Sequence, residues 1–379
     1  MEGGVEVTVA CAEKPGREWL SHANLRWLRA QSWNISAARR LLGLIKLLFC
    51  GLLRDPVAAW RIIGLGEESF RNRLNLWHKL LPFVGRSWDV IYFPWNFGAI
   101  EYLPLFDLGI PVVVSCRGAQ INIEPHDPGR NAILEKLSLT FQKATAVHCV
   151  SEAIRNEASR YGLDPKKAWV IHPSVDPDFF RPAERVELAN ETFDIISTGF
   201  LTWRKGYEYA LVAVRRLWDQ GIPAHFHIIG DGPGFSRLLY TISDMNLAGK
   251  VHLHGRVTPL EVRDRLQKSN AFLLSSVSEG ISNAVLEAMA CGLPVVSTDC
   301  GGMREAITEG KEGFLVPVRD PEAIAVALAR LAKDPELSHR LGQAARQRIL
   351  KEFTLKRQIG KFIELYQEAI KNSGAKYFS

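Results

Sequence analysis

The chain has 379 residues, of which 47% are hydrophobic and 23% are charged. This composition argues against disorder, and the length exceeds what one hydrophobic core usually serves, so we expect two folded domains. The net charge of +6 is unevenly placed, because residues 19–66 carry seven basic residues and only one acidic residue, Asp55. The seven basic residues are Arg26, Arg29, Arg39, Arg40, Lys46, Arg54 and Arg61.

The start of the chain and the cysteines predict a cytoplasmic protein. "MEGGVEVTVACAEKPG" opens with acidic rather than basic residues, and its apolar stretch is too short for a signal peptide. The six cysteines show no Cys-x-x-Cys spacing, and several lie in apolar runs. Reduced, buried thiols are therefore expected in place of disulfides or a metal site.

Residues 37–80 read as helices with an unusual distribution of side chains. "LLGLIKLLFCGLL" is shorter than the ~20 residues that span a bilayer, so no membrane crossing is expected. On a helical wheel one stripe holds Arg39, Gly43, Lys46, Cys50 and Arg54, and apolar residues cover the rest. The helix either lies in a membrane interface, basic side toward anionic lipid, or packs its wide apolar face on a sheet. No nucleic-acid motif accompanies the basic residues, so nucleic acid is not an expected partner.

Short apolar runs alternate with helical patterns along the chain, which predicts the α/β class. Runs of this near-continuous apolar kind are typical of parallel strands that helices cover on both faces. After Asp334 the chain reads as helical to its end. The predicted strands are "VEVTVA", "VIYFPW", "PVVVSC" and "AVHCV" in the first half, and "FDIISTG", "AHFHIIG", "VHLHG", "AFLLSS" and "PVVSTD" in the second.

The two halves repeat one pattern. "LGIPVVVSCRG" and "CGLPVVSTDCGG" each contain a helix-ending glycine, a proline, a buried strand and a glycine loop at the carboxyl end of the strand. Ligands of open α/β sheets bind at such ends. Between the halves "RPAERVELANETF" is polar and has no apolar period, so we place the domain boundary there.

The stretch "SEGISNAVLEAMACGLPVVSTDCGG" predicts a nucleotide-sugar site. Ser282 or Asn283 can cap a new helix whose free amides and positive dipole end suit an anion. Glu287 is four residues after Asn283, on the same face and ~6 Å further along, where a carboxylate can accept hydrogen bonds from a ribose diol. Glu279 precedes the helix, on the side of the transferred sugar. The alternative for Glu287 is a solvated helix residue.

The same stretch resembles the Glu-x7-Glu signature of family 4 retaining glycosyltransferases. "STGFLTWRKGYEYAL", "FHIIGDGP", "VHLHGRV" and "TEGKEGFLVP" follow in the family's order, and "VIHPSVDPDFF" resembles its interdomain strand. The resemblance implies the GT-B fold, in which two Rossmann-like domains face each other across a cleft and a C-terminal helix crosses back. It also implies a UDP-, GDP- or ADP-sugar as donor substrate and no cofactor.

The resemblance also implies roles for single residues. Glu279 would contact the donor sugar, Glu287 the ribose hydroxyls, and Lys205 the diphosphate with Arg204 beside it. Arg117 would face the donor sugar. Backbone near Gly255, Arg256 and Val257 would recognise the base. The remaining predicted donor-binding residues are Gly16, Gly199, Gly280, Ile281, Ser282 and Asn283.

Two positions depart from the family's pattern. Phe200 follows Gly199 where the family often has an arginine, so one phosphate contact is missing or comes from Arg204. Arg117 and Gly118 stand where many relatives have His-Gly, so Arg117 either neutralises charge at the site or binds local carbonyls.

Competing motifs point elsewhere but are incomplete. "GDGPGF" has Phe235 where a dinucleotide-binding loop needs its third glycine. Asp176-Pro177-Asp178 matches a bare Asp-x-Asp, yet the proline between the acids favours a turn. The ten histidines show no metal-ligand spacing, and Lys205 and Arg204 supply positive charge for the diphosphate, so no metal is expected.

These observations, together with what the resemblance implies, predict a retaining, metal-independent hexosyltransferase that moves a sugar from a nucleotide diphosphate sugar to a saccharide or lipid-linked acceptor in polysaccharide synthesis. The predicted domains are 1–185 for the acceptor, 186–355 for the donor, and 356–379 for the returning helix. The predicted location is the cytoplasm, and whether the protein also binds the inner face of the cell membrane is left open. The alternatives are a nucleotide-sugar 2-epimerase of the same fold and a non-catalytic, membrane-associated sugar-nucleotide-binding protein.

Overall fold

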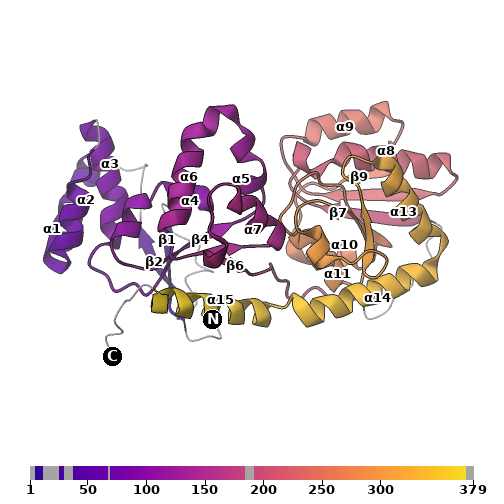
Figure 1. Cartoon of the computed structure of the whole chain (residues 1–379). Helices are drawn as coiled ribbons and strands as arrows, with labels where there is room; N and C mark the ends of the chain where they lie inside the picture. The colour runs from indigo at the N-terminus through magenta and orange to yellow at the C-terminus, as the bar shows by residue number, and fades with distance from the viewer. Residues whose placement is uncertain (1–4, 12–24, 30–36, 67–68, 184–191, 373–379) are drawn as a thin grey trace. The chain divides into compact units, whose positions relative to one another are not determined.

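The computed structural model describes residues 5–11, 25–29, 37–66, 69–183 and 192–372 (Figure 1). The chain forms two compact units. Unit 1 comprises residues 1–115, 135–147 and 363–379, and unit 2 comprises residues 116–134 and 148–362. The predicted boundary at residues 185 and 186 falls in the segment 184–191, outside the described residues, and stays a prediction.

Unit 1 combines short parallel strands with helices. β1 (Val7–Cys11) pairs in parallel with β2 (Leu25–Arg29), and β3 (Ile91–Phe93) pairs in parallel with β4 (Val112–Cys116). β3 and β4 begin a four-stranded sheet of order β3-β4-β5-β6. Its strand β5 (Ala146–Cys149) passes from unit 1 to unit 2 at His148, and β6 (Ala168–Val170) belongs to unit 2. The helices of unit 1 are α1 (Ala37–Arg54), α2 (Pro56–Ile63), α3 (Phe70–Leu80), η2 (Leu81–Phe83), α4 (Asn96–Ile100) and η3 (Leu103–Asp107), with most of α6 (Asn131–Lys143).

Only a narrow side of the helix α1 packs against other helices of unit 1, and most of its apolar side chains are exposed to solvent. Leu44 and Gly51 are buried, and a Cβ on Gly51 would lie 3.6 Å from Ala59 of α2. Leu42 and Phe49 are 68% and 64% exposed. The alternative that the apolar face of this helix packs on a sheet is therefore wrong for the described residues.

Unit 2 is built on a six-stranded, fully parallel sheet of order β12-β11-β10-β7-β8-β9. Its strands are β7 (Phe193–Thr198), β8 (Ala224–Ile229), β9 (Val251–Leu253), β10 (Ala271–Leu274), β11 (Val295–Thr298) and β12 (Gly313–Val316). The chain runs outward from β7 to β9 and then returns to place β10 on the other side of β7. The carboxyl ends of β7 and β10 therefore mark the switch point, where open α/β sheets bind ligands.

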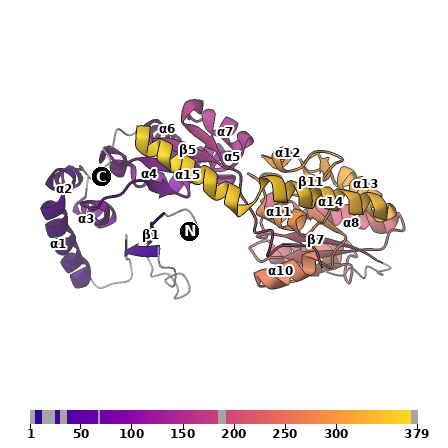
Figure 2. The same ribbon diagram turned by 90° about the horizontal axis from the view of Figure 1, so that it is seen from below.

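Helices cover both faces of this sheet (Figure 1). One face packs a core against α8 (Tyr207–Asp219), α9 (Phe235–Asp244) and α13 (Pro321–Lys333). The other packs against α10 (Pro259–Leu266), α11 (Asn283–Ala290) and α14 (Pro335–Glu352). Figure 2, which is seen from below, shows α14 in front. The shorter helices of unit 2 are α5 (Ala119–Asn122), η4 (Glu124–His126), η5 (Pro128–Arg130), α7 (Glu152–Ser159), η6 (Pro165–Lys167), η7 (Trp203–Lys205) and α12 (Met303–Ala306).

The last part of the chain is helical, as predicted, with one break. α14 ends at Glu352 and α15 (Leu355–Asn372) follows after two residues. α15 belongs to unit 2 up to Phe362 and to unit 1 beyond it. In unit 1 its Tyr366 ring lies edge-on to Tyr92 of β3, with centroids 6.1 Å apart.

All nine predicted strands exist, and the described residues contain three further strands that were not predicted. β2 carries Arg26 and Arg29 among its apolar residues, so it lacks the signal that identified the others. β6 and β12 are apolar runs as long as β3 and β10 and could have been predicted. Within the described helices, none is long and apolar enough to span a membrane.

Candidate active site

The loops that follow β7 and β10 meet at the switch point of unit 2. Lys205 ends the short helix η7 after β7, and Glu279 lies in the loop after β10. The Lys205 Nζ atom donates to Glu279 Oε1 at 2.7 Å, and the Ser276 hydroxyl donates to the same oxygen at 2.9 Å. The side chains of Lys205 and Glu279 are 17% and 16% exposed. The two predicted residues therefore form one ion pair that solvent and a ligand can still reach.

Backbone contacts hold these two loops side by side. The Val277 amide donates to the Arg204 carbonyl at 2.7 Å, and the Ser275 hydroxyl donates to the Lys205 carbonyl at 2.8 Å. Gly206 has a φ of +60°, and a Cβ there would lie 2.2 Å from the Ser275 carbonyl oxygen. Only glycine satisfies both conditions, so the Arg-Lys-Gly order places Lys205 against the β10 loop.

Gly199 makes room for the lysine. A Cβ on Gly199 would lie 2.9 Å from Lys205 Cε and 3.3 Å from its Nζ. The Lys205 side chain therefore lies across the glycine at the carboxyl end of β7. Phe200, the departure from the family's pattern, is 60% exposed.

The helix α11 begins beside Glu279 with an open amino terminus. Ser282 is its N-cap residue, but the Ser282 side chain makes no capping hydrogen bond. Asn283 is the first helical residue and is exposed. The Val285 and Leu286 amides donate to the Ser282 carbonyl, so within the described residues the Asn283 and Ala284 amides and the positive end of the helix dipole are available to an anion. Gly280 and Ile281, which precede the cap, are buried.

Glu287 lies one turn into α11, and its carboxylate can accept hydrogen bonds. Its side chain is half-buried, and burial raises the pKa of its carboxyl to about 7. Among the described residues, no hydrogen bond or ion pair of this carboxylate is found. A partly buried carboxylate without a partner is costly, and hydroxyl donors from a ligand would compensate it. The alternative of a solvated helix residue does not fit this environment.

The predicted base-recognition residues lie on the same edge of the sheet. Gly255, Arg256 and Val257 form the start of the loop between β9 and α10. Gly255 has a φ of +68°, and its carbonyl accepts a hydrogen bond from the Gly230 amide at 2.8 Å. Arg256 is exposed. The last predicted donor-binding residue, Gly16, lies outside the described residues.

Arg117 and Gly118 follow β4 at the end of the repeated strand pattern. Gly118 has a φ of +37°, and a Cβ there would lie 3.5 Å from the Gly280 amide nitrogen. The loop after β4 therefore touches the loop that carries Glu279. The charge of Arg117 acts on His148, whose pKa is lowered to about 4 mainly by burial.

Two residues near Glu279 were missed by the sequence interpretation. Ser276 donates to the Glu279 carboxylate, as described above. Asn122, at the end of α5, donates from Nδ2 to the Glu279 carbonyl oxygen at 3.0 Å and to the Ser278 hydroxyl at 3.3 Å. Ser276 could have been found from its position in the signature loop, but nothing in the sequence around Asn122 pointed to this contact.

The competing motifs have structural roles. The Asp176 carboxylate accepts hydrogen bonds from the amides of Asp178 and Phe179, which confirms the predicted turn. Gly230 and Gly232 of "GDGPGF" lie against the β7 loop, where a Cβ on Gly230 would be 1.9 Å from the Gly199 carbonyl oxygen. Over the described residues, no group of three or more His, Cys, Asp or Glu side chains is arranged to hold a metal ion.

Two family profiles match the chain in succession. Glycosyltransferase Family 4 matches residues 2–179, and Glycosyl transferases group 1 matches residues 180–348. WcaL of Salmonella typhimurium, a glycosyltransferase assigned to colanic acid biosynthesis, is 30% identical over 234 residues, which cover 59% of this chain and 57% of WcaL. AmsK of Erwinia amylovora, an amylovoran biosynthesis glycosyltransferase, is 32% identical over 248 residues, which cover 62% of this chain and 61% of AmsK. The chain therefore spans little more than half the length of these relatives.

Among solved structures, HepE of Anabaena in complex with UDP and glucose superposes on the chain with a TM-score of 0.70. The match covers 95% of this chain and 91% of HepE at 16% sequence identity. At that identity the likeness concerns the fold, and it confirms the predicted α/β architecture of two Rossmann-like domains.

Proposed function

This chain belongs to glycosyltransferase family 4, and we propose on that basis that it transfers a sugar from a nucleotide diphosphate sugar to a saccharide acceptor. The observation that carries the proposal is the Lys205–Glu279 ion pair. It lies beside the open amino terminus of α11, and Glu287 follows one turn into that helix. Glu279 suits the transferred sugar, Lys205 and the free helix amides suit the diphosphate, and Glu287 suits the ribose.

Each group has a distinct role in this proposal. Lys205, Arg204 and the first amides of α11 bind the diphosphate and stabilise the negative charge that develops as it leaves. Glu287 accepts hydrogen bonds from the ribose hydroxyls, and Glu279 orients the transferred sugar. Arg117 adds positive charge near the sugar, while Gly255, Arg256 and Val257 bind the base.

The reaction we propose retains the anomeric configuration and needs no metal. The bond from the sugar C1 to the diphosphate oxygen breaks, and the acceptor oxygen forms its bond to C1 on the same face. The departing phosphate oxygen takes the acceptor proton. The positive charges at the site replace the metal that would otherwise neutralise the diphosphate.

The ligands and names of the similar proteins favour particular donor and acceptor substrates. HepE was crystallised with UDP and glucose, which favours a UDP-sugar over a GDP- or ADP-sugar as the donor. WcaL and AmsK are named for the synthesis of polysaccharides, which favours a growing, lipid-linked saccharide as the acceptor. Such an acceptor would be met at a membrane surface, on the cytoplasmic side where nucleotide sugars are available.

Unit 1 offers a surface for that membrane. We define the α1–α2 apolar surface as the exposed residues Leu41, Leu42, Ile45, Phe49, Leu53, Val57 and Trp60. Exposed basic residues Lys46 and Arg54 accompany it, and the carboxylate of Asp55 is used to cap α2 at the Ala58 amide. An exposed apolar face with a tryptophan and basic residues fits a helix pair lying in an anionic lipid interface. The face that meets lipid in this proposal is the apolar one, flanked by the predicted basic stripe.

The experiment combines a donor panel with acceptor dependence. Purified protein is mixed with UDP-, GDP- and ADP-sugars, and nucleotide release is measured with and without membrane extract that contains lipid-linked saccharides. We expect release that requires the acceptor and a product whose anomeric configuration by NMR equals that of the donor. Acceptor-independent release with an altered sugar would indicate the 2-epimerase, and binding without turnover would indicate the non-catalytic protein.

A further inference from the structure

The loop that carries Glu279 is held on one side by a residue far away in the sequence. Asn122 donates from Nδ2 to the Glu279 carbonyl oxygen at 3.0 Å and to the Ser278 hydroxyl at 3.3 Å. The residues involved are 157 positions apart and belong to the same compact unit. The asparagine therefore binds the backbone of the loop that carries Glu279, whereas Lys205 and Ser276 bind the Glu279 carboxylate.

The other side of the loop is held by the glycines after β11. Gly301 has a φ of +56°, and a Cβ there would lie 1.9 Å from the same Glu279 carbonyl oxygen. The Gly302 amide donates to the Gly280 carbonyl at 2.6 Å. The peptide that joins Glu279 to Gly280 is thus enclosed between Asn122 and two glycines that allow no extra atom.

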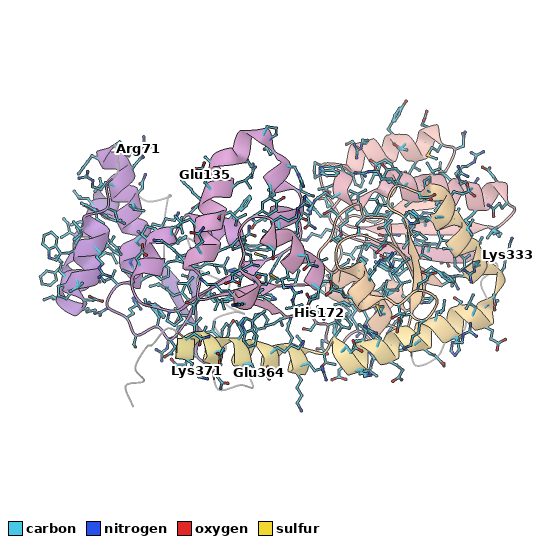
Figure 3. The ribbon with its side chains drawn as sticks, viewed as in Figure 1. Arg71, Glu135, His172, Lys333, Glu364 and Lys371 are labelled. Atoms are coloured by element: carbon cyan, nitrogen blue, oxygen red, sulfur yellow. The ribbon has the colours of Figure 1, made fainter. Side chains whose placement is uncertain are left out.

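This second side is anchored by Glu305, three residues after Gly302. Its carboxylate accepts hydrogen bonds from the amides of Glu152 and Ala153 at 2.8 and 3.1 Å, at the amino terminus of α7. It also contacts Nε2 of His172, labelled in Figure 3, at 2.9 Å. Glu305 thus anchors the glycine side of the loop to the backbone of α7. On the other side Gly118 lies against Gly280, and Asn122 supplies the side-chain hydrogen bonds.

We propose that Asn122 is a positioning residue that orients Glu279 toward the donor sugar, an inference that rests on the proposed glycosyl transfer. The direction of a glutamate side chain follows from the orientation of its own peptide backbone. Without the Asn122 amide, the Glu279 carbonyl loses its donor and the peptide can rotate, which moves the carboxylate away from the sugar. The diphosphate site on Lys205 and α11 does not involve Asn122, so binding of a nucleotide without a sugar is independent of it.

The test compares Asn122→Ala, Asn122→Asp and Asn122→Gln with the wild type. Asn72→Ala, at an exposed position on α3, is the matched control. With the donor that the wild type uses, we expect the kcat of Asn122→Ala to fall ~10-fold, which corresponds to ~1.4 kcal/mol. Asn122→Asp should lose more, because it sets an acceptor against the Glu279 carbonyl. Asn122→Gln should recover part of the loss, while the Kd for UDP should stay within two-fold of the wild type in every variant.

Hydrogen exchange supplies a readout that does not depend on turnover. We expect peptides covering residues 276–282 to exchange faster in Asn122→Ala than in the wild type, and unchanged exchange in Asn72→Ala. Unchanged exchange of this loop in Asn122→Ala, or an equal loss of UDP affinity and kcat, overturns the positioning role. Faster exchange in a protein that transfers no sugar would instead contradict the proposed function and leave the contact itself established.

Discussion

The Nζ atom of Lys205 and the Oε1 atom of Glu279 lie 2.7 Å apart, although the two residues are 74 positions apart in the chain. In this arrangement the proposed phosphate cation is neutralised by the proposed sugar-orienting carboxylate. A bound diphosphate would share the positive charge of Lys205 with the Glu279 carboxylate.

Glu279→Gln separates these two roles. The glutamine leaves Lys205 with an uncompensated positive charge, so we expect UDP to bind at least as tightly as to the wild type. Turnover should fall ~10² to 10³-fold, the usual effect of removing one group that stabilises the transition state. Lys205→Ala should weaken UDP binding and lower turnover together. Kinetics of Glu279→Gln equal to those of the wild type would rule out its role.

Glu287→Gln should stabilise the protein while damaging its donor site. Burial raises the pKa of Glu287 from 4.5 to about 7, so the folded state binds more protons than the unfolded state between these values. Stability is therefore lost as pH rises through this window, by an amount on the order of 2–3 kcal/mol at pH 8. We expect Glu287→Gln to unfold at higher urea than the wild type at pH 8, with little difference at pH 4. Donor affinity by calorimetry should fall, and a variant less stable at pH 8 would contradict this account.

A histidine cluster should produce the opposite pH dependence. His227 on β8 and His254, which directly follows β9, approach to 3.0 Å, and His227 faces Asp194 while His254 faces Arg265. Burial first, and then the charge of Arg265, lowers the pKa of His254 to about 4. Because the unfolded state binds more protons below pH 6.5, stability is lost as pH falls from 6.5 toward 4.

The variant His254→Gln tests this assignment. It should lose less stability than the wild type between pH 6.5 and pH 4, as measured by thermal unfolding in matched buffers. The comparison uses the difference between the two proteins, because Glu287 contributes a trend of opposite sign to both. Parallel curves for the two proteins would show that His254 does not contribute to acid unfolding.

Transfer activity should survive excess chelator. The positive charge of Lys205, Arg204 and the α11 amino terminus is expected to replace a metal at the diphosphate. Nucleotide release is measured before and after treatment with EDTA and after addition of Mg²⁺ or Mn²⁺. Activity that is lost and then restored by either ion would contradict metal independence and direct attention to Asp176 and Asp178.

The α1–α2 apolar surface should bind anionic vesicles. Its apolar residues would enter the interface, and each basic residue near an anionic surface would add ~1 kcal/mol. In co-sedimentation we expect binding to vesicles with anionic lipid, a decrease with added salt, and a large loss for Ile45→Glu with Phe49→Glu. Leu239→Glu on α9 is the matched control, since Leu239 is as exposed as Ile45. If the protein does not bind anionic vesicles at low salt, the α1–α2 apolar surface is not a membrane-binding surface.

The sequence by itself determined the features that depend on neighbours along the chain. Apolar runs predicted nine strands, because a strand buried on both faces needs consecutive apolar residues. The four-residue step from Asn283 to Glu287 predicted that both lie on one face of a helix, because the helix period is 3.6 residues. The roles of Lys205 and Glu279 came from the order of motifs shared with a family and not from spacing alone.

Only the tertiary structure decided which distant residues meet. Asn122 reaches the Glu279 carbonyl because α5 and the β10 loop converge within one unit, and a single asparagine in a short helix carries no periodic signal. The same holds for α1, whose wide apolar face suited a buried helix and a surface helix equally well. Burial depends on what packs against a face, and that depends on the path of the whole chain. Among the described residues of α1, Leu44 and Gly51 are buried, whereas Leu42 and Phe49 are exposed.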